Sequence, residues 1–275
     1  MIGRNSWLVC DASASCDECE VSMVKVYVAS HINVPMPSLP YCVPLQTGSA
    51  AKEPWEGYLR DDVGDNISHK NRFFGEVTGL YWVWKNTTDE KVGWCHYRRF
   101  FSPMLFRPDQ YKGVAVDLNL AQHILDLDRE GKIFDFELNV TELILPTKIP
   151  AISTFHYCAT HRPADWAAML HAFEVIYPSE AEDVRKFFAQ ENHLHWWCMF
   201  ISSRRILNEY CEWLFPLLFY LETIIVPADD DFHCRVFAFL TEHLFNWWTT
   251  SRGVQAVNRP IIFLDQAAFA AANGG

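Results

Sequence analysis

Residues 93–101 read Gly-Trp-Cys-His-Tyr-Arg-Arg-Phe-Phe, and this run constrains the fold more than any other. Two adjacent arginines, Arg98 and Arg99, stand within an apolar, aromatic segment that predicts a buried strand. Burying a guanidinium group is costly unless anions or hydrogen-bond acceptors meet it. The fold must therefore bring carboxylates or an anionic ligand to this pair, and the planar fork of arginine suits phosphate well.

The composition predicts a globular chain with a large core. Half of the 275 residues are hydrophobic and 15% are aromatic, which is enough for one large domain. The net charge of -11 argues against nucleic-acid binding, which requires a basic surface. The nine cysteines favour buried thiols of an intracellular protein over a disulfide framework. Cys10, Cys16 and Cys19 lie close together, but no fourth zinc ligand follows at a familiar spacing.

Neither a signal peptide nor a membrane span is expected. Residues 1–21 have no apolar core. The most apolar long stretch, residues 210–228, is interrupted by Glu212, Pro216 and Glu222. We predict a cytoplasmic protein, with peripheral contact to the inner face of a membrane left open.

Three segments are predicted along the chain. A strong strand signal follows Met23, so we predict a disordered extension over residues 1–22 and one folded domain over residues 23–266. The small residues of 267–275 predict a frayed tail. Residues 35–54 are rich in proline, glycine and serine and predict a long loop.

Strand and helix signals alternate after this loop. Ser68 predicts the N-cap of a helix reaching about Lys85, and residues 92–101 predict the next strand. The order strand, helix, strand is typical of an α/β sheet. Further helices are predicted at residues 118–128, 164–176, 181–190, 204–222 and 235–248, with a kink or break at Pro216, and further strands at 142–146 and 196–202.

Alternate side chains of an extended strand share a face, so His96 and Arg98 should face one way and Tyr97 and Arg99 the other. We expect one arginine to meet a diphosphate in a cleft. The other would meet an internal carboxylate such as Glu76 or Glu242. Structural ion pairs for both arginines are the alternative.

Asp61, Asp62, Asp65 and Asn66 form an acidic turn before the predicted helix. Clustered carboxylates can bind Mg²⁺ or Mn²⁺, hold sugar hydroxyls or act as a general base. Helix capping is the alternative, and it is the commoner role of such a turn.

Arg235 and Glu242 are two helical turns apart and so share one helix face. A salt bridge to another element is the first interpretation of this pair, and a catalytic carboxylate is the second. The three aspartates at 229–231 match an Asp-X-Asp metal–diphosphate pattern only weakly, as do Asp126 and Asp128.

Histidines and tryptophans also gather in the second half of the chain. The histidines are His193 and His195, and the tryptophans stand in the pairs 196–197 and 247–248. Tryptophan rings stack on sugars but more often belong to a core. The glycine-rich phosphate loops and the Gly-x-Ser-x-Gly elbow are missing from the sequence.

Three stretches together resemble a bacterial glycosyltransferase family. They are Asp-Asn-Ile-Ser-His-Lys-Asn at 65–71, Glu-Val-Thr-Gly-Leu-Tyr-Trp-Val-Trp-Lys-Asn at 76–86, and the run at 93–101 with its His-Tyr-Arg-Arg motif. That family works in capsular and exopolysaccharide synthesis and is catalogued as a domain of unknown function. Some members are similar to galactofuranosyltransferases. The resemblance extends over residues 24–250.

The resemblance implies a GT-A-like, Rossmann-like α/β fold: a single domain with a mostly parallel sheet flanked by helices. It further implies transfer of a hexosyl unit, galactofuranosyl among the candidates, from a nucleotide diphosphate sugar. The implied acceptor is a glycan or lipid-linked oligosaccharide, and Mn²⁺ or Mg²⁺ is a candidate cofactor without assigned ligands.

The site residues follow from matching these motifs to the required chemistry. A diphosphate leaving group needs positive charge, and an inverting transfer needs a carboxylate that deprotonates the acceptor hydroxyl. The candidate catalytic carboxylates are Asp62, Asp65 and Glu242. The candidate substrate-binding residues are Asn66, Ser68, Asn71, His96, Tyr97, Arg98, Arg99 and Arg235.

Two positions depart from the family pattern, which usually has asparagine at Cys198 and arginine at His243. If these positions touch substrate, sugar specificity differs or activity is lost. The alternative function is therefore a non-catalytic carbohydrate-binding or scaffold protein on the same fold. A nucleotide-sugar hydrolase or phosphotransferase is a third, weaker candidate.

Overall fold

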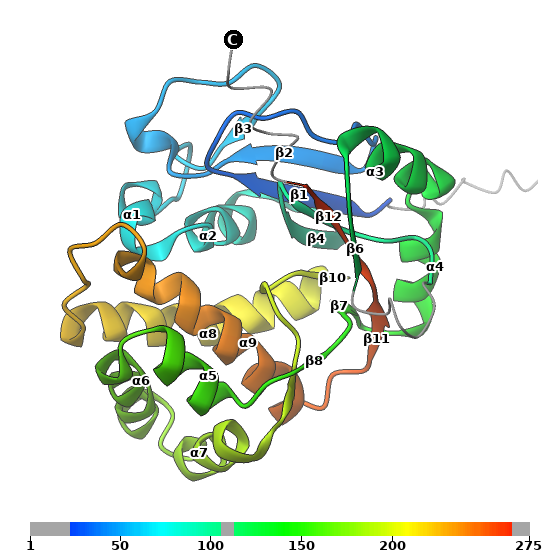
Figure 1. Ribbon diagram of the computed structural model, residues 1–275. Helices are drawn as coiled ribbons and strands as arrows, with labels where there is room; N and C mark the ends of the chain where they lie inside the picture. Colours follow the sequence, from blue (N-terminus) through cyan, green and yellow to red (C-terminus); the bar gives the residue numbers. More distant parts are fainter. Residues whose placement is uncertain (1–22, 106–112, 266–275) are drawn as a thin grey trace, which may run out of the picture.

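The computed structural model describes residues 23–105 and 113–265 (Figure 1). The extension predicted over residues 1–22 and the tail over 267–275 lie outside the described residues, as do Cys10, Cys16 and Cys19. The described cysteines are all free thiols. Of the described helices, none is long and apolar enough to cross a lipid bilayer.

The strands and helices alternate along the chain, as the sequence predicts. The strands are β1 Lys25–Ser30, β2 Cys42–Gln46, β3 Leu59–Arg60, β4 Lys91–His96, β5 Arg99–Phe101, β6 Gly113–Val116, β7 Leu143–Pro146, β8 Ile149–Pro150, β9 His193–Leu194, β10 Phe200–Ser203, β11 Ala256–Arg259 and β12 Ile261–Leu264. The α-helices are α1 Asn71–Phe74, α2 Val77–Asn86, α3 Leu118–Leu125, α4 Lys132–Val140, α5 Ser153–Thr160, α6 Pro163–Ile176, α7 Ala181–Gln190, α8 Arg204–Ile224 and α9 Val236–Ser251.

One mixed sheet organises the molecule, and its strand order is β11-β7-β10-β4-β1-β2-β3. The pairs β1–β2, β1–β4, β2–β3, β7–β11 and β6–β12 are parallel. Strand β10 is antiparallel to both of its neighbours, and β5 joins β4 to β12. The mostly parallel, helix-flanked α/β sheet predicted from the sequence is confirmed.

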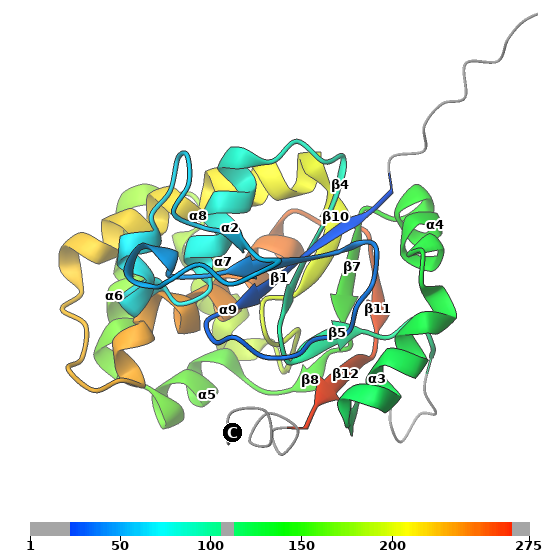
Figure 2. The same ribbon diagram turned by 90° about the horizontal axis from the view of Figure 1, so that it is seen from above.

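The two faces of the sheet bury two separate cores, because successive side chains of a strand point to opposite faces. In β1, Tyr27 and Ala29 belong to a large core shared with α2, α6, α8 and α9. Val26 and Val28 belong to a smaller core with residues of α3 and α4. Figures 1 and 2 show α3 and α4 on one side of the sheet and the larger helical layer on the other.

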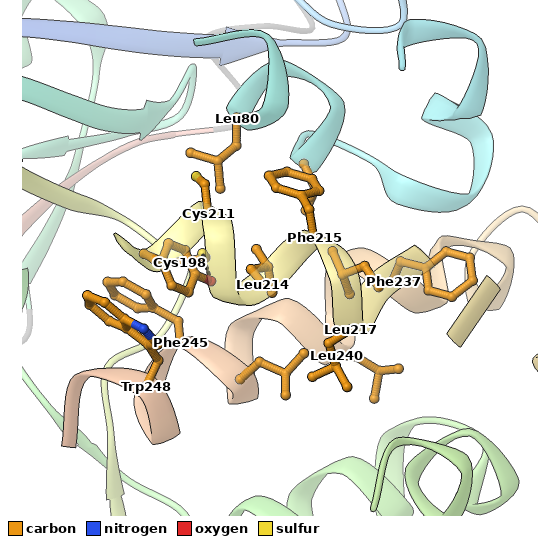
Figure 3. Close-up of a cluster of buried hydrophobic side chains, with 14 of the residues drawn as sticks. Leu80, Cys198, Cys211, Leu214, Phe215, Leu217, Phe237, Leu240, Phe245 and Trp248 are labelled. Atoms are coloured by element: carbon orange, nitrogen blue, oxygen red, sulfur yellow. Dashed lines mark hydrogen bonds between the residues drawn. The ribbon is translucent and has the colours of Figure 1, made fainter. Parts of the chain in front are cut away.

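The helical layer is held by contacts between α8 and α9. Leu214 and Leu217 of α8 and Leu240 and Phe245 of α9 belong to one buried cluster, which Figure 3 shows between the two helices. Pro216 was predicted to kink or break this helix; it lies inside α8 without ending it, so a break is excluded. The buried leucines on either side of Pro216 stabilise the helix despite the missing N–H.

The loop predicted over residues 35–54 is partly wrong, because it contains β2. The O atom of Tyr41 accepts from Val26 N at 2.8 Å, and Thr47 N donates to Ser30 O at 2.8 Å. Since alternate residues of a strand turn their amides to opposite neighbours, Pro44 directs its nitrogen away from β1. On that side β3 begins to pair only at Leu45, so the proline interrupts no ladder.

The helix predicted from Ser68 to about Lys85 is broken into a 3₁₀ turn, α1 and α2. Gly75 lies at the break with φ 53°, a left-handed conformation that glycine adopts without steric cost. A Cβ atom there would lie 3.1 Å from the Cβ of Ala238 on α9. The close approach of α9 and the left-handed backbone together require glycine at the break.

Other boundaries also differ from the predictions. The strand predicted over 196–202 begins only at Phe200, because Trp197 and Cys198 have left-handed backbones. The helix predicted over 235–248 is present as α9, and it is buried on most sides. Helices α4 and α5 and strands β11 and β12 were not predicted from the sequence.

Candidate active site

The strand predicted over residues 92–101 is a hairpin. His96 at the end of β4 pairs antiparallel with Arg99 at the start of β5, and Tyr97 and Arg98 form the turn between them. The predicted alternation of side chains across this segment is therefore wrong. Because the chain reverses, Arg98 and Arg99 line the same cavity as His96. We call residues 96–99 the arginine turn.

The arginine turn lies where ligands bind in open α/β sheets. Strand β1 has the parallel strands β2 and β4 on its two sides, so the strand order reverses there. A crevice at such a switch point, outside the carboxyl ends of the strands, is a recurrent ligand site. His31 follows β1 and His96 ends β4, so both stand at this position.

Three cavities succeed one another along this edge and share residues. The strand-end cavity, of about 230 Å³, is lined by Ala29, His31, Thr47, Lys52, Asn71, Arg72, Gly75, Glu76, His96, Asp231, Cys234 and Arg235. The central cavity, of about 200 Å³, is lined by His31, Glu76, His96, Arg98, Arg99, Phe232, Arg235, Ala238, Phe239 and Glu242. The tryptophan cavity, of about 320 Å³, is lined by Arg98, Arg99, Ala115, Trp197, Phe263, Leu264 and Asp265.

A larger cavity of about 620 Å³ lies elsewhere, between β1, β2 and the loop that includes residues 33–39. Its walls include Met36, Leu39 and Tyr58, and none of the site residues predicted from the sequence lines it. The charged chemistry of the described residues is instead concentrated in the three smaller cavities.

The three arginines of the central cavity are held by aromatic rings. The guanidinium carbon of Arg98 lies 5.2 Å from the ring centre of Tyr97, and that of Arg99 lies 5.6 Å from Trp197. The guanidinium of Arg235 lies 5.3 Å from the ring of Phe232. Such cation–π contacts position a guanidinium group without using its N–H donors.

These guanidinium groups are not neutralised by carboxylates of the described residues. None of Arg98, Arg99 and Arg235 has a carboxylate oxygen within 4.0 Å among the described residues. The Nε atoms of Arg98 and Arg235 are buried without a hydrogen-bond partner. The cavity therefore contains preorganised donors for an anion.

Glu76 and Glu242 are the carboxylates of the central cavity. Burial raises the pKa of Glu242 to about 7, and the charge of Glu76 adds to this while Arg99 opposes it. Burial lowers the pKa of Arg99, which both carboxylates counteract. The expected carboxylates thus lie near the arginine turn, but they act at a distance rather than as direct ion pairs.

His31 and His96, the histidines of the central cavity, both have lowered pKa values. Burial and the charges of Arg99 and Arg98 hold the pKa of His96 well below its usual range. Burial and the nearby Lys52 lower the pKa of His31 as well. Tyr97 is buried and packs edge-on against His31 at 5.4 Å between ring centres. This packing fixes the arginine turn against the end of β1.

Asp61 of the acidic turn is a fully buried structural carboxylate. It accepts hydrogen bonds from the N atoms of Gly48 and Ser49, both at 2.9 Å, and from Ser68 Oγ at 2.6 Å and Thr78 Oγ1 at 2.7 Å. Ser68 therefore binds Asp61 instead of capping a helix, and that predicted cap is wrong. Asp61 joins the loop after β2 to the start of α2.

The other polar residues of the acidic turn bind neighbouring groups. Asp62 accepts from Arg60 at 2.7 and 3.0 Å, which lowers the pKa of Asp62. Asp65 accepts from the hydroxyl of Tyr81 at 3.0 Å, and the amide of Asn66 donates to the O atoms of Asp62 and Gly64.

Asp62, Asp65, Asn66 and Ser68 line none of the three cavities. Asn71 lines the strand-end cavity, where its amide donates to Gly75 O and Thr78 Oγ1. Of the predicted site residues, the structure therefore gathers His96, Arg98, Arg99, Arg235 and Glu242 at one place.

A divalent metal site does not emerge from the described residues, because no three histidine, cysteine or carboxylate side chains are grouped to hold an ion. The carboxylates of the acidic turn, the candidate metal ligands, are occupied by protein donors. They do not fit Mg²⁺ or Mn²⁺ in this arrangement.

The remaining residues considered in the sequence as metal or sugar ligands lie at different places in the fold. Asp230 accepts from the backbone of His233, while Asp231 lines the strand-end cavity. His195 is buried, with Nδ1 2.5 Å from Pro146 O. Trp247 and Trp248 are core residues.

The two positions that depart from the family pattern, Cys198 and His243, line none of the three cavities. His243 is buried among aromatic rings, and burial lowers its pKa to about 3. Cys198 is buried with φ 47°, a conformation in which asparagine is favoured over most residues. These positions therefore concern packing and backbone conformation rather than direct contact with a ligand in these cavities.

The sequence analysis did not single out His31, Lys52 or Arg72 as site residues and treated Glu76 only as an ion-pair partner. One signal was available for Glu76, which directly follows the glycine at the break between α1 and α2. A glycine within a helical pattern often marks a special backbone position. Lys52 and Arg72 gave no comparable signal.

The fold is similar to that of a solved structure described as the apo form of the bifunctional glycosyltransferase WbbM, with a TM-score of 0.78 and 25% sequence identity. The match covers 88% of this chain and 45% of that chain, so this chain spans less than half of the WbbM chain. A search of curated proteins gives no match. Residues 25–253 match the family model described as Domain of unknown function (DUF4422), and the chain therefore belongs to that family.

Proposed function

We propose that this chain is a glycosyltransferase that moves a hexosyl unit from a nucleotide diphosphate sugar to a glycan or lipid-linked oligosaccharide. One observation carries the proposal: Arg98, Arg99 and Arg235 converge on a cavity at the switch point beside Glu242, and no carboxylate oxygen of the described residues lies within 4.0 Å of them. The similarity to WbbM, whose description names it a bifunctional glycosyltransferase, supports the reaction class.

The charge of the central cavity suits a departing diphosphate. When the bond between the anomeric carbon and the diphosphate breaks, negative charge develops on the leaving oxygen. Guanidinium donors fixed in advance stabilise that charge without reorganising during the reaction. Arg98, Arg99 and Arg235 are held in this way by Tyr97, Trp197 and Phe232.

Glu242 is the proposed general base. Its pKa of about 7 lets it exist as a carboxylate near neutral pH and still accept a proton effectively. The acceptor hydroxyl gives its proton to Glu242 while its oxygen attacks the anomeric carbon. Glu76, in the same cavity, raises the basicity of Glu242 and counteracts part of the positive charge around it.

The nucleoside part of the donor is assigned to the strand-end cavity. That cavity stands at the carboxyl ends of β1 and β2 and adds Lys52 and Arg72 to the cationic surface. Asp231, which lines this cavity together with Glu76, would accept hydrogen bonds from ribose hydroxyls. The resemblance stated from the sequence supports galactofuranosyl as the sugar and capsular or exopolysaccharide synthesis, at the cytoplasmic face of a membrane, as the setting.

A donor screen tests the proposal directly. UDP, other nucleoside diphosphates and UDP-sugars, UDP-galactofuranose among them, are added to the purified chain, with and without Mn²⁺ or Mg²⁺. A ligand that binds only the folded state raises the melting temperature. We expect one nucleoside diphosphate series to raise it without added metal, and the further shift on adding a cation measures any contribution of the ion.

A matched pair of arginine variants makes the screen specific. Arg98→Ala removes a cavity guanidinium, whereas Arg205→Ala removes an exposed arginine that pairs with Glu209 on α8. The nucleotide-dependent shift should be lost in the first variant and retained in the second. Equal shifts in both variants, or no nucleotide-dependent shift in the wild-type protein, would contradict the proposal.

A further inference from the structure

Two adjacent tryptophans before β10 have opposite surroundings. The ring of Trp196 lies 4.3 Å from that of His156 in the helical layer. The ring of Trp197 lies 4.9 Å from that of Phe263 on β12, and 5.6 Å separate its centre from the guanidinium of Arg99. Trp197 and Cys198 have φ values of 70° and 47°. This left-handed backbone, unusual for both residues, turns Trp197 out of the helical layer.

Trp197 forms a wall of the tryptophan cavity, whose volume of about 320 Å³ falls within the range of small-ligand sites. Its apolar lining includes Phe263 and Leu264, and Asp265 adds a carboxylate. Arg98 and Arg99 line this cavity and the central one alike. Arg98 and Arg99 therefore connect the tryptophan cavity with the central cavity, which Glu242 lines.

This combination of groups fits a sugar ring. A sugar has an apolar face of C–H groups and a rim of hydroxyls that both donate and accept hydrogen bonds. A partly exposed indole covers the apolar face, and guanidinium and carboxylate groups bind the hydroxyls. The cavity has fewer cationic groups than the strand-end cavity and lies beyond the arginine turn from it. It is thus better suited to a neutral glycan than to a nucleotide.

We propose that the tryptophan cavity binds the terminal sugar of the acceptor, an assignment that rests on the proposed glycosyltransferase function. The acceptor hydroxyl would reach across the arginine turn, and its proton would pass to the carboxylate of Glu242. The hydroxyl oxygen forms the new bond to the anomeric carbon. The bond from that carbon to the diphosphate breaks, and its electron pair leaves with the nucleoside diphosphate beside Arg98 and Arg99.

The test compares Trp197→Ala with Trp196→Ala, a matched change at the neighbouring position outside the cavity. Transfer is measured from UDP-galactofuranose to octyl β-galactopyranoside, and UDP binding is measured by calorimetry. We expect Trp197→Ala to raise KM for the galactoside about tenfold, which corresponds to a loss of about 1.4 kcal/mol from the aromatic contact. Because Trp197 also contacts Arg99, Trp197→Ala should weaken UDP binding as well, so this KM is measured at saturating donor. Trp196→Ala should change neither quantity.

Asp265→Asn is the second variant, since it keeps the shape of the side chain and should raise the same KM with UDP affinity retained. A loss of UDP affinity in Asp265→Asn would overturn the assignment, because it would place the nucleoside in this cavity. An unchanged KM in both Trp197→Ala and Asp265→Asn would overturn it as well, while leaving the proposed function intact.

If the wild-type chain binds no nucleotide or transfers no sugar, the cavity is tested separately by saturation-transfer NMR with octyl β-galactopyranoside. Signals present with the wild-type chain and lost with Trp197→Ala support the glycan site even though the proposed reaction has failed. Equal signals from both proteins, or none from the wild-type chain, overturn the site.

Discussion

The acidic turn and the arginine turn are both short, highly charged segments at strand ends, yet their charges have different partners. The carboxylate of Asp61 accepts four hydrogen bonds from the protein, and Asp62 is paired with Arg60. In contrast, Arg98 and Arg99 lie against aromatic rings without a carboxylate within 4.0 Å in the described part of the chain. Charge that the protein satisfies internally holds the fold together, whereas preorganised charge without a partner is available to a ligand.

The largest effect is expected at the arginine turn. Arg98→Ala and Arg99→Ala should each reduce transfer about 10²- to 10³-fold, because each removes a fixed donor to the developing diphosphate charge. Stability should stay within about 1 kcal/mol, since no protein ion pair is lost. Steady-state kinetics and urea unfolding measure the two quantities. If both variants fold and transfer sugar at the normal rate, the arginine turn does not serve a ligand and its contrast with the acidic turn is refuted.

The acidic turn should respond in the opposite way, through stability. Asp61→Ala leaves the N–H groups of Gly48 and Ser49 and the hydroxyls of Ser68 and Thr78 without their acceptor. Buried donors left without partners cost about 1–3 kcal/mol each, so we expect a loss of about 3 kcal/mol or more. Urea unfolding of this variant beside Arg98→Ala gives the comparison directly. A stability equal to that of the wild-type chain would refute the structural role of Asp61.

The pH dependence of transfer tests Glu242. A base must be deprotonated, so the rate should fall about tenfold for each pH unit below about 7 and level off above it. The contribution of Glu242 to the free energy of unfolding changes with pH in the opposite direction to the transfer rate. The folded pKa is raised above its ordinary value of 4.5, so the contribution of Glu242 is full at low pH and is lost as pH rises through about 7.

Glu242→Gln separates these effects, because glutamine keeps the shape of the side chain and cannot accept the proton. This variant should lose most of the transfer rate and the pH dependence near 7 together. A Glu242→Gln enzyme that transfers sugar with the wild-type pH profile would exclude Glu242 as the base, and the same variant of Glu76 would then be the next one to test.

The smallest effect is expected at Asp62. Its pair with Arg60 is partly exposed, with 22% of each side chain accessible, and such pairs contribute about 1 kcal/mol or less. Asp62→Asn should therefore change stability slightly and leave transfer unchanged. The same transfer and unfolding assays apply. If this variant folds normally but no longer transfers sugar, the acidic turn has a catalytic role and the comparison with the arginine turn fails.

Much of the fold could be predicted from periodicity. The strand signal of β1 and the helical pattern of α6 and α7 depend on side chains within one element, and these predictions are confirmed. The break at Gly75 and the strand at Pro44 depend on neighbours distant in sequence. Ala238 of α9 lies close to Gly75, and Pro44 fits into β2 because β3 pairs with β2 only from Leu45 onward. Local patterns contain no information about such contacts.

The candidate site was predicted in part for the same reason. Unusual residues in an apolar run identified Arg98 and Arg99, and helical spacing related Arg235 to Glu242. Asp62 and Asp65 became candidates because carboxylates cluster in the acidic turn and because the first motif of the family resemblance begins at Asp65. Only the hydrogen bonds to Arg60 and Tyr81 show that these carboxylates have partners within the protein.

The amino-acid sequence by itself determined that two arginines must occupy a largely apolar segment beside a sheet. It did not determine the direction in which the side chains of the two arginines point. The hairpin pairing of His96 with Arg99 decided that both guanidinium groups enter one cavity, and the packing of α9 against α1 and α2 brought Glu242 to the same place. The physical reason is that burial cost is a property of each side chain, whereas the direction of a side chain depends on backbone reversals and on packing between distant elements.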